Sequence, residues 1–222
     1  TTALSPFAQA VFDRSYAHHP GETWEECAAR VAAAVADNDR QEQQFYEMIR
    51  DRVFMPGGRY LYSAGGPIMQ VGNCFGLVAA DSREGWSDVL RDTIMCLSMG
   101  GGVGVEYSGL RARGTPIKRM GGVSSGPVSL MQMVNECARH VMAGGARRSA
   151  LWAGLHWEHP DIPEFLAVKQ WDPDTRARKA ARFEIPAPLD MTNISVVIDQ
   201  RYLDGLASGD PAIVSLHQQI TE

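Results

Sequence analysis

Apolar residues recur at helical spacing through most of the first fifty positions. Residues 23–26 (Thr-Trp-Glu-Glu) have the spacing of a capping box, in which the first and fourth residues satisfy each other's backbone N–H groups. An alanine-rich segment follows at 27–36, and 41–52 places its large apolar side chains near one side. Two helices are therefore expected here, whereas the glycines and prolines of 55–72 predict an irregular stretch.

Beyond residue 72 the pattern changes to short apolar runs separated by amphipathic segments. The runs predict four strands, at 74–80, 103–107, 150–157 and 193–198. Helices are expected after Ser82, a suitable N-cap, and from Pro127, which suits the first helical position. A short helix is expected over 160–168, a charged surface segment over 172–182, and helical structure from 199 onwards. This alternation predicts an α/β fold with a parallel sheet, and four strands are too few to close a barrel.

Composition and charge narrow the classes of function. A chain of 222 residues forms one domain or two small ones, and 45% hydrophobic residues is ordinary for a soluble protein. The net charge of −5 gives no basic surface for nucleic acid, and no run approaches the ~20 apolar residues of a membrane helix. The first residues lack the basic start and apolar core of a signal peptide. Four widely spaced cysteines fit free thiols, so we expect a cytoplasmic protein without nucleic-acid or membrane partners.

Three glycine-rich runs lie at 55–59, 100–104 and 143–148. Glycine is costly in regular structure, and close approach of backbone N–H groups to an anion is one reason to gather it. Tight turns are the alternative for any single run. A basic loop over 111–119 and an arginine pair at 147–148 add guanidinium groups suited to phosphate, unless they form a solvated surface. Neither a P-loop motif nor a nucleophile elbow is present in the sequence.

Two single residues have both a structural and a chemical interpretation. Cys74 lies where the irregular stretch enters a strand, so it is either a small buried hydrophobe or a reactive thiol with the Asn73 amide beside it. The other three cysteines lie on or near apolar helix stripes and are expected in the core. Asp81 either caps the following helix or accepts a hydrogen bond from a ribose hydroxyl at the carboxyl end of a strand.

Seven stretches, taken together, resemble the large catalytic subunit of ribonucleotide reductase, and most closely its adenosylcobalamin-dependent class. They are 55–62 (MPGGRYLY), 73–75 (NCF), 81–86 (DSREGW), 100–105 (GGGVGV), 126–135 (GPVSLMQMVN), 144–149 (GGARRS) and 186–195 (PAPLDMTNIS). The resemblance covers roughly 53–198, most of the chain, and rests on the order and spacing of many motifs.

The resemblance implies a ten-stranded α/β barrel built from two parallel half-sheets. Residues 53–222 would form its first half, preceded by a short helical region at 1–52. The family's finger-loop motif Asn-Pro-Cys-Gly-Glu, its second reducing cysteine and its C-terminal cysteine pair do not occur in these 222 residues. We therefore expect this half to be inactive without a second half, supplied as a separate chain or as further C-terminal sequence.

The resemblance also implies the residues of three sites. Cys74 would be the first cysteine of the reducing pair. Contacts to the ribonucleotide substrate are expected from Met55, Pro56, Gly57, Asn73, Gly102 and Arg147. A deoxynucleoside triphosphate or ATP effector is expected at Asp81, Ser82, Arg111, Lys118, Arg119, Gly144 and Gly145.

Cofactor and partners follow from the same resemblance. The complete enzyme would use adenosylcobalamin, bound mainly by the second half, and a thioredoxin-like reductant acting through that half. A homodimer would form through the helices that start near Ser82 and Pro127. A stand-alone nucleotide-binding regulatory module is the alternative function. A related radical enzyme with a non-nucleotide substrate is a third, which Asp81 and the basic loop disfavour.

Overall fold

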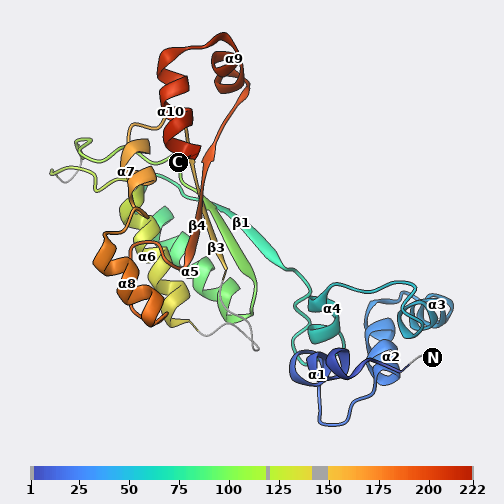
Figure 1. Ribbon diagram of the computed structural model, residues 1–222. Coiled ribbons are helices and arrows are strands. Elements are labelled where there is room, and N and C mark those ends of the chain that lie inside the picture. The colour runs from blue at the N-terminus through green and yellow to red at the C-terminus, as the bar shows by residue number, and fades with distance from the viewer. Residues whose placement is uncertain (1–2, 119–120, 142–149, 222) are drawn as a thin grey trace. The chain divides into compact units, whose positions relative to one another are not determined.

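The computed structural model describes residues 3–118, 121–141 and 150–221 (Figure 1). Contacts between residues divide the chain into two compact units, Thr1–Asn73 and Cys74–Glu222. Each unit has a hydrophobic core of its own. We describe the two units separately.

The N-terminal unit is helical. Its helices are α1 (Pro6–Ser15), α2 (Trp24–Val35), α3 (Asp39–Arg50) and α4 (Gly58–Ser63). The predicted capping box is present at the start of α2, where the Thr23 hydroxyl accepts from the Glu26 backbone and the Glu26 carboxylate accepts from the Thr23 backbone. The core consists of Phe12, Trp24, Cys27, Ala28, Val31, Ile49, Leu61 and Ala64.

The helical unit extends further along the chain than the boundary expected at residue 53. Helix α4 falls inside the stretch predicted to be irregular, and Leu61 and Ala64 complete the helical core. The Arg30 guanidinium donates to the backbone carbonyls of both residues, at 3.2 and 2.6 Å. These contacts attach residues 58–64 to α2, so the structural division falls between Asn73 and Cys74.

The second unit is a four-stranded parallel sheet with helices, as the sequence predicts. Its strands are β1 (Cys74–Val78), β2 (Gly102–Glu106), β3 (Leu151–His156) and β4 (Thr192–Val197), in the order β1-β2-β3-β4. Its helices are α5 (Arg83–Ser98), α6 (Pro127–His140), α7 (Ile162–Ala167), α8 (Pro173–Ala181), α9 (Gln200–Ser208) and α10 (Pro211–Thr221). Helix α8 covers the segment expected to be a charged surface, and none of its residues is buried.

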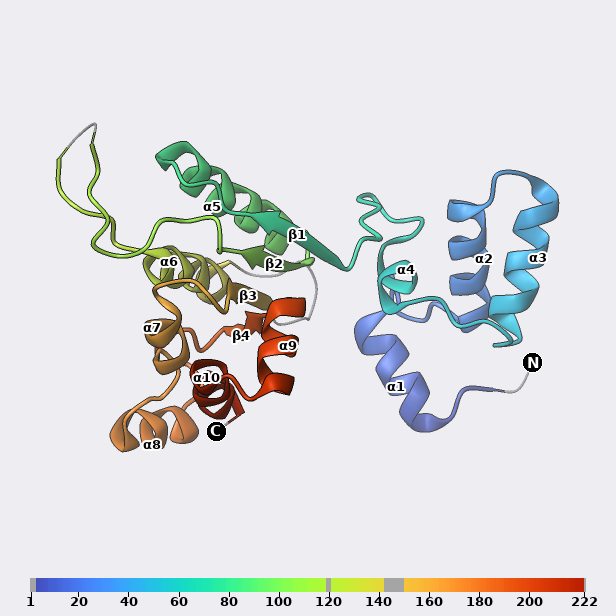
Figure 2. The ribbon, with the colours of Figure 1, turned by 90° about the horizontal axis from the view of Figure 1, so that it is seen from above.

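The two faces of the sheet differ sharply. Alternate side chains of a strand point to opposite faces. One face is apolar and packs against helices, with α5 and α6 side by side (Figure 2). It includes the buried residues Val103, Val105, Leu151, Ala153 and Leu155.

The opposite face is rich in glycine and carries Cys74 at its edge. Trp152 lies flat on this face, because a Cβ added at Gly104 or Gly154 would stand 3.2 or 2.3 Å from its ring. The indole Nε1 donates to the Ser195 hydroxyl at 2.9 Å, which fixes the ring in this orientation. Trp152 is nevertheless 37% exposed, so helices of the described residues leave this face largely open. No helix in the described part of the chain is both long and apolar enough to cross a membrane.

Candidate functional site

A hollow of about 420 Å³ lies between the start of α5 and the loop of residues 107–126, here called the β2–α6 loop. The described part of this loop reaches outwards beside α5 and α6 (Figure 2). Its two arms pair with each other, since Ser124 N donates to Thr115 O and Gly114 N donates to Ser124 O. The hollow is lined by Asp81, Ser82, Arg83, Trp86, Ser87, Leu90, Arg111, Ile117, Val123, Ser124, Ser125 and Met133.

An ion pair closes one side of this hollow. Arg111 Nε donates to both carboxylate oxygens of Asp81, at 2.8 and 3.0 Å, and each side chain remains more than a third exposed. Ser82 provides the helix cap, because its hydroxyl accepts from Gly85 N at 2.9 Å. The expected capping role of Asp81 therefore belongs to Ser82, and the Asp81 carboxylate is directed to the hollow. A carboxylate, a guanidinium and the N-terminal end of α5 meet at one place, an arrangement suited to a sugar hydroxyl and an anion.

Cys74 is the first residue of β1 and is exposed. It pairs in register with Gly102 on β2, and a Cβ added at Gly102 would stand 3.5 Å from the Cys74 sulfur. Asn73, directly before it, is also exposed. The interpretation of Cys74 as a small buried hydrophobe is wrong, since the sulfur lies on the open face of the sheet.

Three expected substrate residues lie in the helical unit, directly before α4. Met55 and Gly57 are exposed, whereas Pro56 is buried. Pro56 and Gly57 line an apolar hollow of about 390 Å³ together with side chains of α2 and α3. None of these three residues has a polar side chain, so only their backbone groups are able to form hydrogen bonds with a ligand.

Two family models cover most of the chain. Residues 2–68 match the model described as the all-alpha domain of ribonucleotide reductase, and residues 72–188 match the model described as its barrel domain. The chain belongs to the ribonucleotide reductase family. The two matches meet close to the boundary between the two structural units.

Individual reductases support this membership. The vitamin B12-dependent ribonucleoside-diphosphate reductase of Thermoplasma acidophilum is 28% identical over 212 residues, which is 93% of this chain and 26% of that protein. The protein of the same name from Mycobacterium tuberculosis strain H37Rv is 30% identical over 192 residues, 84% of this chain and 25% of that protein. The chain thus spans about a quarter of the length of these curated relatives.

A solved structure shows the same fold. The class Id ribonucleotide reductase alpha subunit of Actinobacillus ureae matches with a TM-score of 0.77 at 18% identity, over 97% of this chain and 37% of that one. The reductase barrel explains why the present sheet has two free edges and one open face among the described residues.

The structure brings together part of the expected effector set. Asp81, Ser82 and Arg111 line the same hollow, whereas Lys118 is an exposed neighbour of the lining residue Ile117. Arg119, Gly144, Gly145 and Arg147 lie outside the described residues.

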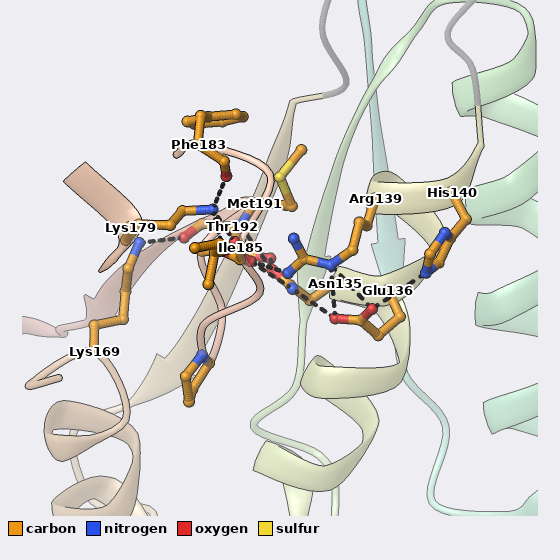
Figure 3. A network of polar contacts seen from close by, with 12 residues as sticks. Asn135, Glu136, Arg139, His140, Lys169, Lys179, Phe183, Ile185, Met191 and Thr192 are labelled. Carbon is orange, nitrogen blue, oxygen red and sulfur yellow. Dashed lines mark hydrogen bonds and ion pairs between the residues drawn. The ribbon is translucent and has the colours of Figure 1, made fainter. Parts of the chain in front are cut away.

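A buried polar network was not expected from the sequence (Figure 3). The Asp190 carboxylate is fully buried and accepts hydrogen bonds from Arg139, Lys179 and Asn135. Burial alone would raise the pKa of Asp190, but these donors outweigh it and hold that pKa at about 2. The Asn135 carbonyl oxygen accepts in turn from Met191 N and from the Thr192 hydroxyl, both at 2.9 Å. The network ties α6 to the start of β4 and to α8.

A second polar cluster lies at the carboxyl ends of β3 and β4. His156, Glu158 and Asp199 bring a nitrogen and two carboxylate oxygens within 4.8 Å of one another, as a metal site does. The Arg201 guanidinium pairs with both carboxylates, at 2.5 and 2.9 Å. This cluster therefore already contains its own cation.

Proposed function

We propose that this chain is the effector-binding and dimer-forming part of a ribonucleotide reductase large chain, and that it carries one of the two cysteines that reduce the substrate. The complete enzyme converts ribonucleotides to deoxyribonucleotides. The observation that carries the proposal is the hollow where Asp81, Arg111 and the start of α5 converge, on a chain that belongs to this family.

The hollow fits a nucleoside triphosphate in volume and chemistry. Pockets for small ligands usually have about 300–1,000 Å³, and this one has about 420 Å³. Asp81 would accept a hydrogen bond from a ribose hydroxyl. Arg111 would pair with a phosphate, with Lys118 and Arg119 nearby in sequence. Gly144 and Gly145 would complete the effector set.

Cys74 would supply one of two thiols to the ribose. Reduction replaces the 2′ hydroxyl by hydrogen and releases water, while two thiols lose two electrons and two protons and join as a disulfide. The exposed sulfur on the open sheet face supports this role, because it can meet both a substrate and a second thiol. The assignment of Met55, Pro56, Gly57, Asn73, Gly102 and Arg147 to the substrate stays a prediction from the resemblance.

The outer sides of α5 and α6 support a homodimer. Ile94 and Met95 on α5 and Met133 on α6 are 41–55% exposed, although each is a large apolar side chain. Exposed apolar groups on two adjacent helices suit contact with a second copy of the chain.

The relatives' names suggest adenosylcobalamin as the cofactor of the complete enzyme. A corrin ring with its nucleotide tail is much larger than the hollow at Asp81. The residues described here do not fit it, and we assign none of them to that cofactor. The second half of the reductase would hold it, and would also receive a thioredoxin-like reductant.

Calorimetric titration of the chain with deoxynucleoside triphosphates tests the effector site. A charge-assisted hydrogen bond contributes about 1.5–3 kcal/mol, so Asp81→Ala is expected to weaken binding roughly tenfold or more. Asp88→Ala on the same helix is the matched control, because the exposed Asp88 carboxylate pairs with the exposed Arg91 and does not line the hollow. Equal affinity in Asp81→Ala and the unaltered chain would contradict the proposed site.

A second measurement separates the reductase from a stand-alone nucleotide-binding module. The 222-residue chain alone should reduce no ribonucleotide, even with adenosylcobalamin and a dithiol, because it lacks the finger-loop cysteine. Adding the segments that the longer relatives carry should restore reduction. Nucleotide binding without restored reduction would favour the stand-alone nucleotide-binding module.

A further inference from the structure

The segment after β3 holds the β2–α6 loop on both sides of Arg111. Three of its side chains, His159, Asp161 and Glu164, form what we call the loop clamp. His159 and Asp161 are buried, with 8% and 9% of their surface exposed. None of these residues lines the hollow at Asp81.

His159 fixes the backbone just before Arg111. Its Nε2 lies 2.8 Å from the Leu110 carbonyl oxygen, and its Nδ1 lies 3.0 Å from Asp161 N. A backbone N–H can only donate, so Nδ1 is the acceptor and Nε2 carries the hydrogen given to Leu110. Both ring nitrogens are therefore used in one neutral tautomer.

Asp161 and Glu164 fix the chain just after Arg111. Asp161 Oδ2 accepts from Arg113 N at 2.8 Å. The Glu164 carboxylate receives both Nε and Nη2 of the Arg113 guanidinium, at 2.8 and 2.6 Å. The same Asp161 oxygen would lie 2.7 Å from a Cβ at Gly126, so the clamp also packs against the returning arm of the loop.

We propose that His159 and Asp161 are positioning residues for effector recognition, and that they act through Arg111. They hold the carbonyl of residue 110 and the amide of residue 113, so the backbone between them has little freedom. Arg111 is thereby presented to Asp81 and to the phosphate of a nucleotide before binding, which lowers the ordering cost of binding. This inference rests on the proposed function of the hollow.

A double-mutant cycle on the full chain tests whether the clamp acts through Arg111. The probe is deoxyadenosine triphosphate, titrated by calorimetry against Asp161→Ala, Arg111→Ala and the double variant. We expect Asp161→Ala to weaken binding about tenfold in the unaltered background and less than about twofold in the Arg111→Ala background, since contacts that share a partner are non-additive. Asp161→Asn keeps an acceptor for Arg113 N and should restore binding to within about twofold of the unaltered chain.

Three results would overturn the inference. One is equal weakening by Asp161→Ala in both backgrounds, which would make the clamp a general structural support. Another is unchanged affinity in Asp161→Ala. The third is unchanged hydrogen exchange at the Arg113 amide in Asp161→Ala without nucleotide, because loss of its acceptor should speed that exchange.

The titrations also separate the failure of this inference from the failure of the proposed function. If the unaltered chain binds no deoxyadenosine triphosphate, the proposed function fails and the role in recognition fails with it. If the unaltered chain binds but the cycle is additive, only the clamp's action through Arg111 is overturned.

Discussion

Exposure separates Cys74 from the other three cysteines, all of which lie in the described ranges. Burial raises the pKa of the Cys27 thiol to about 11, and it also raises the pKa values of Cys96 and Cys137. The thiolate is the reactive form, so these three thiols are poor nucleophiles at neutral pH. Cys74 is exposed, and its sulfur lies beside a glycine.

Replacement of Cys74 should therefore affect chemistry and not folding. In an active reductase that contains this segment, Cys74→Ser should abolish multiple turnovers with a dithiol, because a hydroxyl cannot form half of a disulfide. Nucleotide binding and melting temperature should stay unchanged. Cys96→Ser is the control and should keep turnover. Full activity in Cys74→Ala would remove the redox role.

The buried charge of Asp190 should contribute to the stability of the second unit. Asp190→Asn would leave Arg139 and Lys179 without their buried anion, which should cost about 3 kcal/mol of unfolding free energy. Denaturant unfolding measures this loss. Asp174→Asn is the control, because Asp174 and Arg178 are largely exposed and such pairs contribute about 0.5 kcal/mol or less. Equal losses in the two variants would contradict the role of the network.

The low pKa of Asp190 predicts that the folded chain loses stability in acid. The pKa of Asp190 is lowered from 3.8 to about 2 in the folded chain, so its contribution to stability is complete above about pH 5 and is lost as the pH falls below 2. A difference of that size corresponds to about 2 kcal/mol. Unfolding curves should show a loss in acid that is about 2 kcal/mol larger in the unaltered chain than in Asp190→Asn, because other carboxylates with a lowered pKa, such as Asp199, act equally in both.

At the scale of elements, local patterns predicted most helices and strands. All four strands, the helices after Ser82 and from Pro127, and the capping box at Thr23 are confirmed. Helix α4 was missed because its contacts come from Arg30, far away in sequence. The segment after Asp172 was expected to be only a charged surface. It is helical because the Asp172 side chain accepts from Thr175 N and caps it.

Pairings between distant elements could not be predicted. From the sequence, Asp81 was either a helix cap or an acceptor for a ribose hydroxyl. Arg111, thirty positions further on, holds its carboxylate towards the hollow. Asp190 meets Asn135 and Arg139 across more than fifty positions. One local signal was available, since Asn135 lies among the buried apolar residues of α6 and a buried amide needs a partner.

Comparing substitutions at two glycines of the β2–α6 loop distinguishes the cost of backbone strain from the cost of steric crowding. Gly114 and Gly126 both have positive φ, +81° and +78°, but only at Gly126 would a Cβ meet other atoms, within 2.7 Å. Gly114→Ala should cost about 1–2 kcal/mol from strain alone, and Gly126→Ala about 2–4 kcal/mol because overpacking adds to it. Thermal unfolding of both variants measures the difference. Equal costs would show that Asp161 moves aside without penalty.

At the scale of the whole molecule, two cores are joined by residues 65–73, which contain no helix or strand. Pro67, Ile68 and Met69 in this segment are exposed. Limited digestion with a protease that cleaves beside large apolar residues should cut first near Ile68 and Met69 and yield two resistant fragments. Mass spectrometry identifies the sites. First cuts inside α5 or α6 would contradict the division into two units.

Trp152 gives the open face of the sheet an optical reporter. It is the most exposed of the five tryptophans, all of which lie in the described ranges: Trp24 is buried, and the other three are half-buried. An indole in water emits at longer wavelengths than one in apolar surroundings. The glycines beneath the ring and the hydrogen bond to Ser195 keep it on this face. A segment or ligand that covers this part of the face should therefore shift the emission of Trp152 to shorter wavelengths, so its arrival can be followed by the colour of the emitted light.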